Sequence, residues 1–94
     1  MLKITENFES GNTVRLRLDG TLSKDAFGEL TDAYIVHRDA TDRIVILDMA
    51  GVEFMNDQAA RELINLRNER LRIINCSPFI ATLLETIAKV ERRQ

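Results

Sequence analysis

The sequence has 94 residues, 45% of them hydrophobic and 30% charged, and a net charge of −2 at pH 7. A chain of this length and composition fits one folded domain over residues 1–94, with a modest core that needs no metal or disulfide. The slightly negative charge argues against nucleic acid as a partner, because phosphate-backbone binding requires clustered lysine and arginine.

The N-terminal part of the chain predicts a β-hairpin. Residues 2–5 alternate between apolar and polar, and residues 9–12 contain the glycine and polar residues of a turn. The next strand alternates strictly, so that one face meets the core and the other meets water. Its core face consists of Val14, Leu16 and Leu18. Asp19 and Gly20 are expected to end this strand.

A helix is predicted to begin at Ser23, whose hydroxyl can cap it, and Asp25 in the first turn complements the helix dipole. Apolar residues then recur at helical spacing, which predicts that the helix lies on a sheet along this stripe. The stripe consists of Phe27, Leu30, Ala33, Tyr34 and His37. Thr41 and Asp42 mark the expected exit from the helix.

The apolar run Ile44–Leu47 predicts a strand that is covered on both faces and is therefore central and parallel. After an acidic, glycine-containing corner, Val52 and Phe54 are expected to return the chain to the apolar layer. A second helix is predicted from about Asp57, because apolar residues again recur at helical spacing. Its buried side consists of Ala59, Ala60, Leu63, Ile64 and the aliphatic part of Arg67.

Residues 71–75 predict a further short strand, and Ser77 with Pro78 predicts the start of a third helix. This helix is expected to bury Ile80, Leu83, Leu84, Ile87 and Ala88. Strands that alternate with helices require parallel crossovers, whereas the opening hairpin adds an antiparallel pair. The sequence therefore predicts an α/β fold with a single mixed β-sheet and α-helices packed mainly on one face.

Four segments carry a resemblance when they are taken together in this order. They are DGTLS at 19–23, IVILDMAGVEFM at 44–55, NDQA at 56–59 and SPFIATLLE at 77–85. Together they resemble, over nearly the whole chain, the STAS domain of anti-sigma factor antagonists. The resemblance implies a single STAS-like domain with a protein partner, which in the family is an anti-sigma factor that also acts as the domain's kinase.

The family typically carries an Asp-Ser-Ser-Gly run at the start of the helix after the central strand, and the second serine is phosphorylated. This chain has Asn56, Asp57, Gln58 and Ala59 at those positions. Gln58 has no hydroxyl and cannot accept a phosphoryl group. The resemblance therefore implies the fold and a partner surface without the usual phosphorylation switch. The helix after Gln58 also reaches the next strand early, which indicates a shortened turn.

The polar residues at the predicted helix starts have two interpretations. Asn56 and Asp57 suit N-capping positions, and Asp57 alternatively places a fixed negative charge next to the family's phosphate position, which one carboxylate imitates poorly. Ser23 and Ser77 are predicted caps, with regulatory phosphorylation as the alternative.

The leading hypothesis is a cytoplasmic protein-interaction module that resembles an anti-sigma factor antagonist. Its expected partner surface has Asn56, Asp57, Gln58 and Arg61 at the centre, with Gly20, Thr21 and Ser23 beside them. Three alternatives stay open. They are an accessory subunit of a transport complex of the lipid-transport type, a small-ligand-binding protein that uses Asp48 and His37, and a homo-oligomer.

Catalysis would require His37, Asp48 and Cys76 to converge, and nothing in their spacing requires it. His37 is expected at the surface or half-buried near a helix end, and Asp48 is expected to bind backbone amides of the corner after its strand. Cys76 is expected to act as a small buried hydrophobe. The sequence contains no glycine-rich phosphate loop and no metal-ligand spacing, so we expect no enzyme, no cofactor and no metal.

The setting of the protein is predicted from its single cysteine and its lack of long apolar stretches. Cys76 stands alone, which excludes an intramolecular disulfide and favours a reducing cytoplasm. The first residues show no basic segment followed by an apolar run, and no stretch approaches the roughly 18 apolar residues of a membrane span. Neither export nor membrane insertion is expected.

Overall fold

The structure is a computed structural model that describes residues 1–38, 43–67 and 70–92. Residues 91 and 92 are described by their backbone only. Its elements are β1 (Leu2–Ser10), β2 (Thr13–Leu22), α1 (Lys24–Arg38), β3 (Ile44–Met55), α2 (Asp57–Leu66), β4 (Leu71–Ile74) and α3 (Pro78–Arg92). The predicted order of strands and helices is confirmed. The expected helix exit at Thr41 and Asp42 lies outside the described residues. No helix in the described ranges has the length and apolar character needed to cross a membrane.

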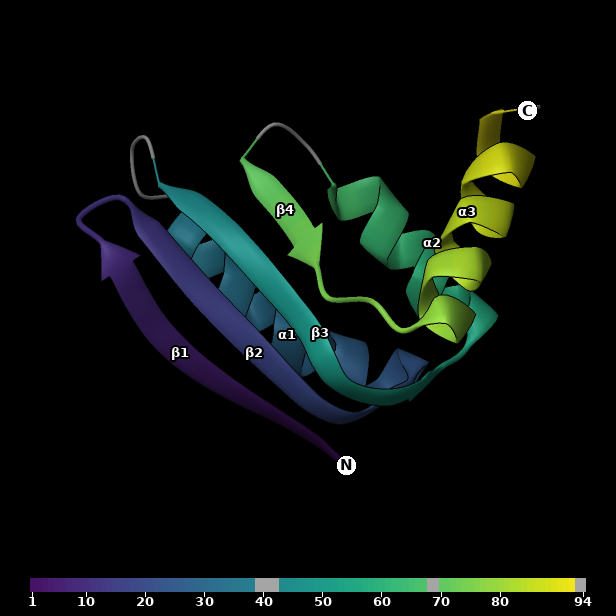
Figure 1. Ribbon diagram of the computed structural model, residues 1–94, viewed down its shortest axis with the longest axis horizontal. Coiled ribbons are helices and arrows are strands. Elements are labelled where there is room, and N and C mark those ends of the chain that lie inside the picture. The colour runs from purple at the N-terminus through teal and green to yellow at the C-terminus, as the bar shows by residue number, and fades with distance from the viewer. Residues whose placement is uncertain (39–42, 68–69, 93–94) are drawn as a thin grey trace.

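The four strands form one mixed sheet in the order β1-β2-β3-β4. β1 runs antiparallel to β2, whereas β3 runs parallel to both β2 and β4. Figure 1 shows α1 behind the sheet, with α2 and α3 on the β4 side, so that the other face of the sheet is open toward the viewer. The predicted α/β fold, with one mixed sheet and helices mainly on one face, is confirmed.

The core lies between the helices and the covered face of the sheet. The alternating residues of β2 and the stripe of α1 are buried as predicted, apart from Ala33, which is half-buried. The buried core residues from the later elements are Val45, Leu47, Met49, Val52, Met55, Ala59, Ala60, Leu63, Leu71, Ile80, Leu84 and Ile87. Arg67 does not extend this surface, because α2 ends at Leu66 and Arg67 is an exposed C-cap residue.

β3 has the predicted central place, but only one of its faces is covered. Val45 and Leu47 are buried beneath the helices, whereas Ile44 and Ile46 are half-buried on the open face. The expectation of cover on both faces was wrong because no helix of the described residues lies over that side (Figure 1). Parallel pairing with strands on both sides satisfies the backbone of β3, and the run of β-branched residues suits that position.

β2 and β3 are longer than predicted. Asp19 and Gly20 do not end β2, which continues to Leu22, and the expected corner at residues 48–51 lies inside β3. Polar and glycine residues ordinarily indicate a turn, but here neighbouring strands hold them in the ladder. The sheet therefore carries both strands to the starts of α1 and α2.

Two β-bulges in β3 explain which of its residues reach the core. The register passes from Arg17↔Asp48 to Asp19↔Gly51, and then from Gly20↔Val52 to Thr21↔Phe54. At each step β3 supplies one residue more than β2, so the alternation of its side chains reverses. Val52 and Met55 are consequently buried, whereas Met49 continues the regular alternation of Val45 and Leu47. Phe54 is not in the apolar layer as predicted; it faces outward and is 48% exposed.

Gly20 occupies a backbone position that excludes a side chain. Its φ angle is +110°, and a Cβ at this residue would overlap the backbone oxygen of Met1. Replacing Gly20 with alanine should therefore lower the free energy of unfolding by about 1–3 kcal/mol, the usual range for such backbone strain. Gly28→Ala is the matched control, because open space surrounds this helical glycine. It should raise stability by about 0.5–1 kcal/mol. Urea denaturation of both variants measures these shifts, and equal effects would contradict the strain at Gly20.

Candidate functional site

The residues predicted to form a partner surface meet at one end of the sheet. β2, β3 and β4 are parallel, so their C-terminal ends lie on the same side, and α1, α2 and α3 each begin there (Figure 1). Thr21 pairs with Phe54 and Leu22 pairs with Met55, which brings Ser23 beside Asn56. In parallel α/β sheets this end ordinarily holds binding sites, because loops and helix N-termini gather there.

Polar side chains cap all three helices at this end. The Asn56 Oδ1 accepts the Ala59 amide at 2.9 Å. The hydroxyl oxygens of Ser23 and Ser77 accept amides three residues along the chain, at 3.3 and 3.2 Å. The predicted capping roles of Asn56, Ser23 and Ser77 are thus confirmed. Each cap typically contributes about 0.5–2 kcal/mol and fixes the entry of its helix.

Asp57 and Gln58 form the exposed first turn of α2. The next two residues, Ala59 and Ala60, are fully buried and anchor this turn against the core. The carboxylate of Asp57 lies in the first turn, where the helix dipole favours a negative charge. Arg61 is exposed one turn further along. The α2 start therefore presents polar side chains on a rigid support.

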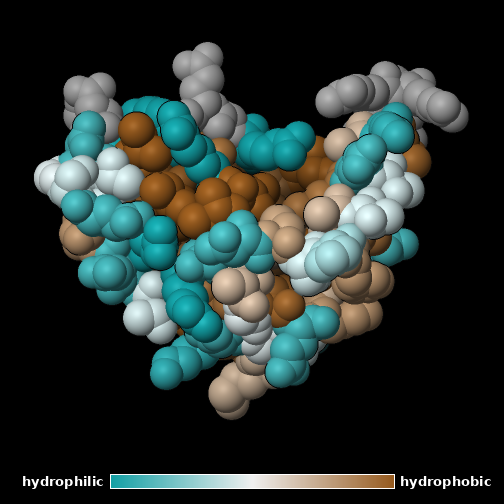
Figure 2. Space-filling view, viewed as in Figure 1, coloured by the Kyte–Doolittle hydropathy of each residue, from teal (hydrophilic) through white to brown (hydrophobic). Residues whose placement is uncertain are grey.

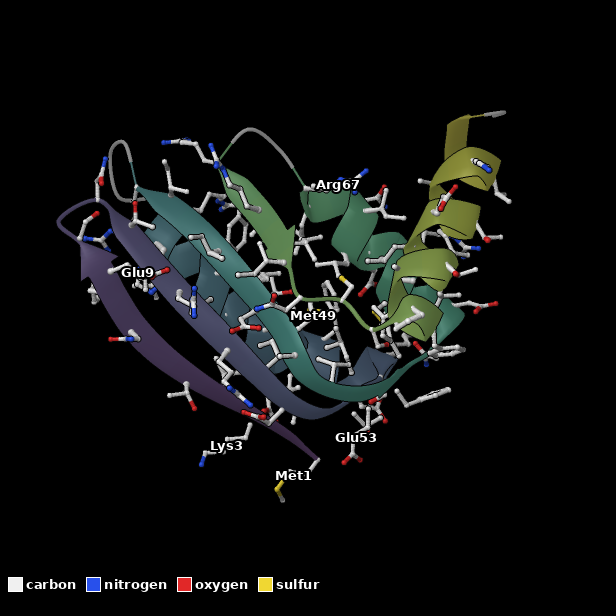
Figure 3. All side chains as sticks on the ribbon, in the orientation of Figure 1. Met1, Lys3, Glu9, Met49, Glu53 and Arg67 are labelled. Atoms are coloured by element: carbon white, nitrogen blue, oxygen red, sulfur yellow. The ribbon has the colours of Figure 1, made fainter. Side chains whose placement is uncertain are left out.

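An exposed aromatic pair adjoins this turn. Phe54, near the end of β3, and Phe79, in the first turn of α3, stack with ring centroids 6.2 Å apart and an interplanar angle of 20°. Phe54 is 48% exposed and Phe79 is 55% exposed. Figure 3 shows Glu53, the residue before Phe54, pointing outward from β3 at this end of the molecule. Exposed aromatic rings beside a polar rim are typical of protein contact surfaces.

Sequence reasoning missed this pair. Phe79 follows the Ser77-Pro78 helix start and falls outside the apolar stripe of α3, so its exposure had a signal in the sequence. For Phe54 no such signal existed. Period-two alternation places it with Val52 in the core, and only the second bulge turns it outward.

Asp48 lies on the open face of the sheet and is only 4% exposed. Its Oδ1 accepts the Ala50 amide and the Asn75 side-chain amide, both at 3.0 Å. The predicted binding of a backbone amide is therefore confirmed, and Asn75 is an additional partner. The hydrogen bond from Asn75 is the largest cause that lowers the pKa of Asp48; the Ala50 amide and the charges of Arg15 and Arg17 lower it further, against the effect of burial.

His37 is buried, as its place in the stripe of α1 predicted; the other expectation, a surface or half-buried position, was wrong. Its Nε2 lies 2.9 Å from Oε2 of Glu6, and its Nδ1 lies 3.0 Å from Nη1 of Arg43. Arginine offers only donors, so Nδ1 accepts and Nε2 carries the proton that is donated to Glu6. The Phe8 ring packs edge-on to His37 and beneath the Arg43 guanidinium. Two side chains of β1 and that of Arg43, the residue before β3, thus enclose His37 and give it a structural role.

The structure does not bring together the residues considered for catalysis or small-ligand binding. His37 packs on the covered side of the sheet, whereas Asp48 lies on the open face. Cys76 is half-buried after β4, and burial raises the pKa of its thiol. Among the residues that the structure describes, no group of three acidic, histidine or cysteine side chains could hold a metal ion.

The comparisons with known proteins concern the fold. No protein-family model matches the sequence, and no curated protein matches it. The chain is similar in structure to the anti-sigma factor antagonist SpoIIAA in its unphosphorylated form, with a TM-score of 0.58 and 20% sequence identity. The likeness covers 95% of this chain and 98% of that chain. The chain therefore has the STAS-like fold that its sequence predicted.

Proposed function

We propose that this chain, whose fold is that of an anti-sigma factor antagonist, is a non-enzymatic protein-interaction module. One observation carries the proposal: the exposed Phe54–Phe79 stack lies beside the polar first turn of α2. We call this surface the docking end. Its members are Gly20, Thr21, Ser23, Phe54, Asn56, Asp57, Gln58, Arg61 and Phe79.

The docking end combines aromatic rings with surrounding polar residues, as protein interfaces do. Buried aromatic anchors carry most of the binding energy in many complexes, and polar residues around them exclude water and set orientation. The Asn56 cap and the buried Ala59 and Ala60 hold the polar turn in place before any partner arrives. Such preorganisation limits the entropy lost on binding.

Gln58 determines how this surface is regulated. An amide side chain accepts no phosphoryl group, so docking does not respond to phosphorylation at this position. Asp57 supplies one fixed negative charge in the same turn. The proposed partner is an anti-sigma factor of the kinase-like class, in the cytoplasm. The lack of a hydroxyl at Gln58 equally favours an accessory subunit of a lipid-transport-type complex as the second candidate.

Asp57→Arg should reduce recovery of the partner in affinity purification from the native cells by about tenfold or more, equivalent to roughly 1.4 kcal/mol. The substitution reverses a charge at the centre of the docking end but removes no buried contact, so the loss of folding stability should stay near 1 kcal/mol. Asp32→Arg is the matched control, because Asp32 is exposed on α1, outside the docking end. Quantitative mass spectrometry of the recovered proteins provides the measurement.

The identity of the recovered protein separates the two candidates. A kinase-like anti-sigma factor supports the first candidate, and transporter subunits support the second. Equal recovery with wild type, Asp57→Arg and Asp32→Arg would refute docking through the start of α2.

A further inference from the structure

An open groove with an apolar floor and charged residues at its rim runs along β4, on the side away from β3. The end of α2, β4 with the residues that follow it, and α3 border a space of about 430 Å³. Its apolar lining includes Ile73, Cys76, Ala81, Leu84 and Ala88. Figure 2 shows hydrophobic surface that extends over β3 and β4 toward α3. The two alanines on α3 leave room that a larger side chain would fill.

The outer edge of β4 has backbone groups without partners. β4 is the last strand of the sheet, and the Val45 amide donates to the Arg70 carbonyl at 2.8 Å. Parallel pairing in this register uses the backbone groups of Arg72 and Ile74, and turns those of Leu71 and Ile73 away from β3. Within the described residues these outward groups form no hydrogen bond. A ready template for another strand therefore borders the groove.

The opposite edge of the sheet differs in character. β1 carries exposed charged residues along its length, among them Lys3, Glu6 and Glu9. Such residues discourage strand pairing at an edge. β4 has the sequence LRII, in which three of four residues are apolar. The two edges thus offer different surfaces. A pocket also adjoins β1, at its first residue Leu2, but in the described part of the chain β4 is the edge strand with few charged residues.

One cation at the rim indicates the charge of the occupant. Arg67 lines the groove, is exposed, and forms no ion pair among the described residues. Figure 3 shows it where α2 ends, beside β4. The other charged residues of the rim, Glu85 and Lys89, pair with each other at 3.4 Å. The uncompensated charge at the groove is therefore positive.

We propose that β4 accepts an extended segment of a partner protein as a fifth strand of the sheet. The segment is apolar at alternate positions, which face the groove, and carries an acidic side chain that pairs with Arg67. Its backbone bonds to the outward amides and carbonyls of Leu71 and Ile73. Strand addition of this kind takes affinity from the main chain and specificity from the pockets. The proposal is independent of the docking end, because the edge of β4 and the groove share no residue with that surface.

Amide hydrogen exchange of the ¹⁵N-labelled protein tests this inference. The probe is an acetylated and amidated nine-residue peptide in which valine alternates with threonine, with one threonine replaced by glutamate. At saturation, exchange of the Leu71 and Ile73 amides should slow by about tenfold or more, as expected for newly hydrogen-bonded groups. Protection at β1 instead, or no protection at saturation, would overturn the proposal.

Ile73→Pro is the first variant. It removes the outward amide of β4 but no hydrogen bond to β3, and an edge strand tolerates proline at such a position. Peptide binding should be lost while the remaining amide spectrum is kept. Arg67→Glu should weaken binding of the glutamate peptide by about fivefold and should favour a peptide with lysine in place of the glutamate. Lys3→Glu, the matched charge reversal on β1 (Figure 3), should change neither the affinity for the glutamate peptide nor the preference for it over the lysine version. Self-association that protects Leu71 and Ile73 without peptide would show a second copy as the occupant and overturn the partner segment.

Discussion

Replacing Phe54 or Phe79 with alanine should weaken binding of the partner at the docking end by about 30-fold for each ring. The estimate corresponds to roughly 2 kcal/mol, the threshold of an interface hot spot. Both rings are about half exposed in the free protein, so a partner gains by burying them. Their mutual stacking contributes only about 0.5–1.5 kcal/mol to the fold. The two substitutions should therefore separate binding from stability.

Titration calorimetry with the purified partner, together with thermal unfolding, provides the comparison. Val36→Ala is the control, because Val36 is 68% exposed on α1 and lies outside the docking end. It should change neither affinity nor melting temperature appreciably. If the phenylalanine variants lost stability while their affinity stayed at the wild-type value, the stack would serve the fold and not a partner.

The second large effect is expected at Asp48. Asp48→Asn should lower the free energy of unfolding by roughly 1.5–3 kcal/mol at pH 7, the range for a hydrogen bond to a charged group. The pKa of Asp48 in the folded protein lies below its ordinary value of 3.8. The stabilisation is therefore complete above the unfolded value and is lost as the pH falls through the folded value. Wild type and variant should converge in strongly acidic solution.

Asn75 supplies the control for this prediction. Its φ angle is +60°, a region that asparagine and glycine adopt more readily than other residues. Asn75→Gly removes the hydrogen bond to Asp48 and adds about 0.4–1 kcal/mol of chain entropy cost. Asn75→Ala removes the same bond and adds about 1–2 kcal/mol of backbone strain. Urea denaturation of both variants across acidic pH provides the measurement. An Asp48→Asn curve parallel to that of wild type at every pH would contradict a stabilising carboxylate.

Local features of the sequence determined much of the fold. The caps at Ser23, Asn56 and Ser77 could be predicted because each bonds an amide three residues away. The strand and helix order followed from hydrophobic periodicity, which depends on neighbouring residues alone. The α2 start could be chosen as a candidate site for the same reason: a buried strand leads directly to a capped polar turn.

Only the tertiary structure decided the features that depend on contacts between distant segments. The bulges in β3 are shifts in its register with β2, and the second of them turns Phe54 outward to meet Phe79. His37 is buried because β1 supplies Glu6 from 31 positions away.

The surroundings of Asp48 and the open edge of β4 also depend on which distant segments of the chain meet. Asn75 reaches Asp48 across 27 positions of the chain. The open edge of β4 exists because no described strand follows it in the sheet. Periodicity carries no information about strand register, pairing partners or sheet edges, since these depend on which segments meet in space. The sequence by itself therefore determined the elements and their caps, and the tertiary packing decided which side chains and which backbone edge remain available to a partner.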